Sequence, residues 1–150
     1  MALRDDLMSE IKEAMKAKAV DRLSALRLIL NGLKEREIAL RGDGVAISDA
    51  DELAVLAKMV KQRRDSISQF EAAGRQDLAD KESAEIVVLQ EFLPQQLTAD
   101  EIAALIEQAI TESGAAVMAD MGKVMAVLKP KIQGRADVGA VSAQVKTRLA

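Results

Sequence analysis

The stretch DRLSALRLILNGLKEREIAL, residues 21–40, decides the fold class. Four of its leucines recur at intervals of three or four residues: Leu23, Leu26, Leu30 and Leu33. That spacing places them on one face of an amphipathic helix, and Asp21 just before them predicts its N-cap. The same period recurs through nearly all of the 150 residues, without the period-2 alternation of a strand. The sequence therefore predicts an all-α protein.

Breaks in the apolar pattern divide the chain into two predicted units. The first is an N-terminal four-helix unit, residues 1–93, and the second is a smaller three-helix bundle, residues 94–150. Leu93 precedes Pro94, and a residue before proline is pushed away from helical geometry, so the fourth helix is expected to end there. Because a unit this small buries little surface, some packing between the two units is expected.

Four local signals predict further helix boundaries. Ser48 and Thr98 each precede an apolar run and have an acidic residue three positions later, which is the spacing of a capping box. Gly74 stands where a glycine usually follows a helix C-terminus. Pro130 is expected to end the sixth helix, because proline interrupts a helical pattern.

The composition excludes several classes of chemistry. The chain has no His, Cys, Trp or Tyr. It therefore has no ligands for the usual zinc, haem or iron–sulfur sites, no disulfide, no cysteine nucleophile and no Ser-His-Asp triad. With two Phe as its only aromatics, an aromatic platform for stacking bases is not expected. The sequence predicts no catalytic residue, no metal and no cofactor.

The N-terminus and the hydropathy pattern bear on location. The first residues are charged and contain no apolar signal-peptide core. No apolar run approaches the roughly 20 residues that a membrane-spanning helix needs. These two observations predict a cytoplasmic protein without a membrane partner.

The small net charge of −3 conceals a segregation of charge. Residues 94–120 hold five acidic and no basic residues, a net −5, whereas residues 121–150 hold six basic and one acidic, 6 − 1 = +5. Such segregation indicates an anion-binding surface. A second basic cluster consists of Lys58, Lys61, Arg63 and Arg64. Of these, Lys58, Lys61 and, less closely, Arg64 would share one helical face. Solvated surface charge is the alternative interpretation of both regions.

The loop around Gly134 is the most suggestive part of the basic region. Lys131 and Arg135 would add positive charge beside a glycine that lets a ligand approach the backbone. The loop also precedes a predicted helix N-terminus, which favours anions. The alternative is structural: Gly134 ends one helix and Asp137 caps the next.

Three motifs, in order along the chain, resemble those of the YqeY proteins. They are KQRRDSI at 61–67, EFLPQQL at 91–97, and DMGKVM at 120–125 followed by GRAD at 134–137. The resemblance implies a small, all-helical, cytosolic protein. It also implies a likeness to the tail of the B subunit of glutamine-dependent aminoacyl-tRNA amidotransferases, which is associated with contacts to the tRNA body.

The resemblance further implies that the chain is not an enzyme on its own. The ATP-dependent active site of the amidotransferase lies in a separate domain, which this chain is expected to lack. A description of this chain as a carbon–nitrogen ligase with glutamine as amido donor would therefore be taken over from the larger enzyme. One departure weakens the likeness: the tail usually reads Gly-Lys-Ala-Asn where residues 134–137 read Gly-Arg-Ala-Asp, which adds a carboxylate.

The sequence and the resemblance together predict a non-catalytic module that contacts tRNA phosphates by shape and not by base stacking. The expected contact residues are Gly122, Lys123, Lys131, Gly134, Arg135, Lys61 and Arg64. The acidic pI argues against strong non-specific binding to long DNA or RNA, and no DNA partner is predicted. The alternative is a helical protein-interaction adaptor without RNA binding, with a partner-helix groove near Met118–Met125, although such a methionine run is more often plain core.

Overall fold

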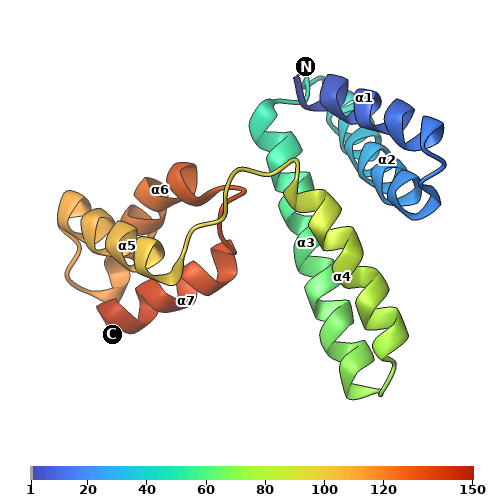
Figure 1. Ribbon diagram of the computed structural model, residues 1–150. Coiled ribbons are helices and arrows are strands. Elements are labelled where there is room, and N and C mark those ends of the chain that lie inside the picture. The colour runs from blue at the N-terminus through green and yellow to red at the C-terminus, as the bar shows by residue number, and fades with distance from the viewer. Residues whose placement is uncertain (1) are drawn as a thin grey trace. The chain divides into compact units, whose positions relative to one another are not determined.

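The computed structural model describes residues 2–150, and that part of the chain contains seven α-helices, one short 3-10 helix and no strand (Figure 1). The helices are α1 (Ala2–Lys16), α2 (Val20–Gly42), α3 (Asp49–Ala72), α4 (Gln76–Gln90), α5 (Ala99–Ser113), the 3-10 helix η1 (Met118–Asp120), α6 (Met121–Ile132) and α7 (Val138–Leu149). The all-α prediction is confirmed. The chain divides into two compact units, unit 1 ending at Leu93 and unit 2 beginning at Pro94.

Unit 1 consists of two helical hairpins, α1–α2 and α3–α4, which meet through α2. Its core contains Leu7, Ile11, Ala14, Leu26, Ile29, Leu33, Leu56, Val60, Ile86 and Leu89. The far half of α3–α4, residues 61–85, extends beyond the α1–α2 hairpin (Figure 1). In this segment, which we call the distal hairpin, Ala79 is the only fully buried residue. The distal hairpin therefore depends on contacts between its own two helices.

Arg22 links three elements of unit 1. Its guanidinium donates to Glu10 of α1 at 2.9 Å and to Glu91, just after α4, at 2.6 Å. These two hydrogen bonds, together with the negative charges of Glu91 and Glu10, raise the pKa of Arg22. The end of α4 is thereby fixed against the α1–α2 hairpin.

Unit 2 packs α5, α6 and α7 around a second core. Its buried residues are Ile106, Ala109, Val124, Met125, Leu128, Ile132, Val141, Val145 and Leu149. Met125 is therefore part of this core, with Met121 packed against it, and Met118 is partly exposed. The methionine run is thus largely explained by packing.

Three of the predicted boundary signals are confirmed in the backbone. Ser48 and Thr98 accept hydrogen bonds from the third residue of α3 and α5, and both capping boxes are complete. Gly74 follows the C-cap of α3 with φ +73°, a conformation that glycine adopts without steric cost. Local sequence chemistry therefore sets these helix ends.

One boundary prediction is wrong, and another is met to within two residues. Helix α2 begins at Val20 with Ala19 as its N-cap, because Leu23 N–H already donates to the Ala19 carbonyl at 2.9 Å; Asp21 lies in the first turn. Helix α6 runs past Pro130 to Ile132. The fixed φ of proline is compatible with a helix and only one N–H is lost, so the chain completes its last turn.

Candidate functional site

The loop between α6 and α7 is held by the segment that opens unit 2. Gln96 Nε2 donates to the Gly134 carbonyl at 2.8 Å, and Leu97 N–H donates to the Arg135 carbonyl at 2.8 Å. In return, Arg135 Nε donates to the Gln95 carbonyl at 3.0 Å. We call these three hydrogen bonds the loop contact. Arg135 thus has a structural role besides any role in ligand binding.

Sequence reasoning missed Gln95 and Gln96 as partners of this loop. They belong to the motif at 91–97, whereas Gly134 and Arg135 belong to the motif at 134–137. The helical period carries no information about a pairing across some 40 residues. The joint presence of the two motifs in one family pattern was the available signal.

Gly134 is required by the backbone at this position. It is buried and adopts φ +74°, where a side chain costs roughly 1–2 kcal/mol. Gly134→Ala should therefore lower the free energy of unfolding by about that amount, measured by urea unfolding followed by circular dichroism. Gly122→Ala is the matched control: Gly122 lies in α6 with open space around it, so alanine should be neutral or stabilise by up to about 1 kcal/mol. Equal stabilities of the two variants would contradict this role.

Asp137 is the N-cap of α7. Its carboxylate accepts from Gly139 N–H at 3.0 Å. The first amides of α7 therefore already face a negative charge, which would repel a phosphate at that helix terminus. The structural interpretation of Gly134 and Asp137 is thus confirmed, and the basic side chains are left as the candidates for anion binding.

The acidic and basic parts of unit 2 neutralise each other in part. Three ion pairs join them: Lys123–Asp120 at 3.7 Å, Lys131–Glu112 at 3.7 Å, and Arg148–Glu107. Much of the segregation seen in the sequence therefore serves contacts within unit 2. Lys129 and Lys146 are exposed and have no carboxylate within ion-pair distance among the described residues.

Asp120 holds Lys123 near the start of α6. The Asp120 carboxylate accepts from the N–H groups of Ala116 at 3.0 Å and Val117 at 3.3 Å. These backbone hydrogen bonds, with the charge of Lys123, lower the pKa of Asp120. Asp120 is therefore ionised at neutral pH, and Lys123 is partly neutralised.

The basic cluster of α3 separates into exposed and paired residues. Lys61 and Arg64 are exposed on the distal hairpin. Arg63 between them is largely buried: its Nε donates to Glu85 at 2.9 Å and lies 3.9 Å from Glu82. Lys58, at the other end of the cluster, is exposed as well, so Arg63 is the member of this cluster whose charge is used within the fold.

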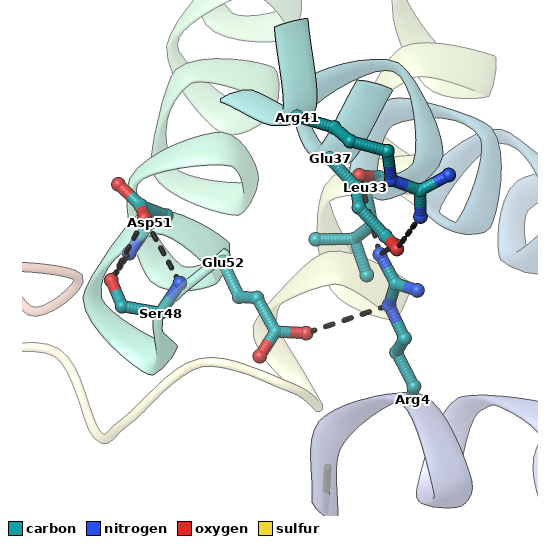
Figure 2. A network of polar contacts seen from close by, with 7 residues as sticks. All are labelled: Arg4, Leu33, Glu37, Arg41, Ser48, Asp51 and Glu52. Carbon is teal, nitrogen blue, oxygen red and sulfur yellow. Dashed lines mark hydrogen bonds and ion pairs between the residues drawn. The ribbon is translucent and has the colours of Figure 1, made fainter. Parts of the chain in front are cut away.

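A polar network in unit 1 was not predicted (Figure 2). Arg4 of α1 forms an ion pair with Glu37 of α2, which also accepts from Arg41 at 2.7 Å. Glu52 of α3 faces Arg4 but is only 1% exposed. The signal in the sequence was the position of Glu52, one helical turn before Leu56, in phase with the apolar stripe of α3.

Within residues 2–150 no group of three or more acidic side chains is arranged to hold a metal ion. No single helix in the same residues is long and apolar enough to cross a membrane. Helix α5 and the segment η1–α6, bent by 96° relative to each other, reach the length and composition of a membrane span only when they are taken together.

Comparison with known proteins identifies relatives over almost the whole length. The family model described as Yqey-like protein matches residues 4–149. "Altered inheritance of mitochondria protein 41, mitochondrial" of Saccharomyces cerevisiae is 31% identical over 144 residues, which cover 94% of this chain and 74% of the relative. The protein of the same name from Lachancea thermotolerans is 35% identical, over 71% of this chain and 57% of that protein. A Schizosaccharomyces pombe protein is 36% identical over 59% of this chain and 70% of its own length.

These names correct one expectation and bear on another. The prediction of a cytoplasmic location is contradicted, because the relatives from Saccharomyces cerevisiae and Lachancea thermotolerans are named as mitochondrial proteins and point to a mitochondrial location instead. An uninformative N-terminus and a lack of apolar runs do not distinguish these two compartments. Neither the family description nor the names of the relatives state a catalytic activity.

Proposed function

The chain belongs to the YqeY-like family, and from this premise we propose that it is a non-catalytic module that contacts the phosphate backbone of tRNA through exposed basic side chains of unit 2. The observation that carries the proposal is the pair of exposed lysines, Lys129 and Lys146, that the internal ion pairs leave without a carboxylate partner. They lie on α6 and α7, on either side of the loop that contains Arg135.

Two paired cations on another face of α6 would add phosphate contacts in unit 2. Lys123 and Lys131 face their carboxylates at 3.7 Å, and the Lys123 side chain is 69% exposed. Exposed ion pairs of this kind contribute at most about 1 kcal/mol. A phosphate group would therefore displace the carboxylate at little cost. Gly122, at the exposed start of α6, leaves room for a backbone to approach.

The mode of recognition follows from the available side chains. With only two Phe, the chain offers little for base stacking. Lysine and arginine contacts to phosphates read the shape of an RNA and the position of its backbone. Lys61 and Arg64 on the distal hairpin would supply a second set of phosphate contacts.

The experiment compares two double variants of the full chain with equal charge changes. Lys129→Glu with Lys146→Glu should weaken binding to an in vitro transcribed tRNA at least tenfold at low salt. The slope of log affinity against log salt should decrease in magnitude by about 1–2, because each lost phosphate contact contributes roughly 0.7–0.9 to that slope. These two lysines are preferred to Arg135, whose replacement would also break the loop contact.

Lys12→Glu with Lys16→Glu, on exposed positions of α1, is the matched control and should leave both quantities nearly unchanged. Equal weakening by the two double variants would show that only net charge matters. Either that result or no tRNA binding by the wild-type chain at low salt would overturn the proposal.

A specific observation favours the adaptor as a second candidate. Val20, Leu28 and Ile38 are exposed along one side of α2. The N-terminal part of that helix borders a shallow hollow lined by Val20, Leu23, Ser24, Arg27, Leu28 and Asn31. A partner helix with an acidic residue opposite Arg27 would suit this surface. Recovery of a stoichiometric protein partner after ribonuclease treatment would favour this function over RNA contact.

A further inference from the structure

Glu52 is a buried carboxylate whose surroundings, within residues 2–150, donate no hydrogen bond to it. It lies in the first turn of α3, and both of its oxygens are buried without a hydrogen-bond partner among residues 2–150. Within these residues its ion-pair partner is Arg4 of α1, whose Nε lies 3.9 Å from Glu52 Oε2, too far for a hydrogen bond. Arg4 Nε is itself buried and likewise has no hydrogen-bond partner in this part of the chain. A buried pair without hydrogen bonds does not recover the cost of removing its charges from water.

Arg4 is also held away from Glu52 by α2. It forms an ion pair with Glu37, and its Nη2 is 3.5 Å from the Leu33 carbonyl (Figure 2). Glu37 is in turn held by Arg41 at 2.7 Å. The cation that could neutralise Glu52 is therefore shared with a better placed carboxylate on a different helix.

From this geometry we propose that Glu52 and Arg4 form a pH-sensitive junction, at which the α1–α2 hairpin loosens from the start of α3 when Glu52 ionises. The junction is closed while Glu52 is neutral, because a neutral carboxyl group loses much less free energy on burial than a carboxylate. Ionisation draws water to the carboxylate, and water reaches it only if the helices separate locally.

The direction of the pH dependence follows from the groups around Glu52. Burial raises the pKa of Glu52; the charges of Arg4 and of the N-terminal amine oppose the increase, and those of Asp49 and Glu37 add to it. A group with a raised pKa in the folded state stabilises that state below its ordinary pKa. The contribution is lost as the pH rises through the raised value. The junction should therefore be tighter in acid than at neutral pH.

The segment that responds should be α1. The capping box of Ser48 and Asp51 keeps the first turn of α3 formed when the junction opens. Helix α1 has 15 residues and packs mainly on α2. Isolated helices of about that length are only marginally stable in water. A loosened α1 would therefore lose its hydrogen bonds more often than α4 or α5.

Hydrogen exchange of the full chain between about pH 3.5 and pH 8, corrected for the intrinsic exchange rate, tests the proposal. The open-to-closed ratio of α1 should rise about tenfold for each unit by which the pKa of Glu52 is raised. Glu52→Gln should abolish the rise and keep α1 at pH 8 as protected as in the wild type at the acid end of that range. Glu35→Gln, at an exposed position of α2, should behave as the wild type.

A second measurement does not depend on any variant. The carbon-13 carboxyl resonance of Glu52 in the wild-type chain should titrate at higher pH than those of the exposed glutamates. Titration of Glu52 with the exposed glutamates would overturn the proposal. An equal rise in α1 exchange in the wild type and Glu52→Gln, or a rise spread evenly over α1, α4 and α5, would overturn it as well.

Discussion

Replacing Leu128 by alanine should lower the free energy of unfolding of unit 2 by about 3 kcal/mol. Leu128 lies on α6 with its side chain fully buried, in the core that α5, α6 and α7 share. The substitution removes three carbon atoms and leaves a cavity that three short helices cannot close completely. A unit of this size has a total stability of only about 3–9 kcal/mol, so the loss would be a large fraction of it.

Urea unfolding of the full chain, followed by circular dichroism at 222 nm, measures the effect. Val117→Ala provides the control, because that side chain in the same unit is 56% exposed and its truncation should cost less than about 0.5 kcal/mol. Similar midpoints for the two variants would mean that Leu128 is not in a closely packed core.

The second large effect is a loss of stability on replacing Arg63, which is not expected for its exposed neighbour Arg64. Arg63→Ala should destabilise the distal hairpin by about 2 kcal/mol, because it leaves Glu85 and Glu82 partly buried without their cation. It also removes the hydrogen bond from Nη1 to the Met59 carbonyl at 3.2 Å. Arg64→Ala, at an exposed position, should change stability by less than about 0.5 kcal/mol.

The same comparison separates folding from binding. Arg64→Ala should weaken tRNA binding without affecting stability, whereas Arg63→Ala should act mainly on stability. Urea unfolding of Arg63→Ala, Glu85→Ala and the double variant would give the interaction energy of the pair. An interaction energy near zero would show that the two side chains contribute independently.

Much of the fold is predictable from local sequence alone. The period of three and four residues is produced by burial of one helix face, so the apolar stripes identify the helices. Capping boxes and a glycine with positive φ depend only on residues close together in the sequence. The helix ends predicted at Ser48, Thr98 and Gly74 are accordingly found in the structure. The N-cap prediction at Asp21 was wrong because the helix begins two residues earlier than it implied, with the apolar Ala19 as its N-cap.

The candidate site was harder to predict because it depends on contacts between distant segments. Net charge along the sequence did not show that Lys131 faces Glu112 on another helix. Nor did it show that Arg135 is hydrogen-bonded to the backbone of Gln95. The burial of Glu52 was not predicted, because a helical stripe does not reveal which of its members is covered by a third helix.

The link made by Arg22 also has a consequence for the order of folding. Most helix contacts in this chain join neighbours along the sequence, such as α1 with α2 and α3 with α4. Contacts of that kind close short loops and form quickly. The hydrogen bond from Arg22 to Glu91 joins residues 69 positions apart. Because both hairpins must exist before these groups can meet, we expect this bond to form after the folding transition state.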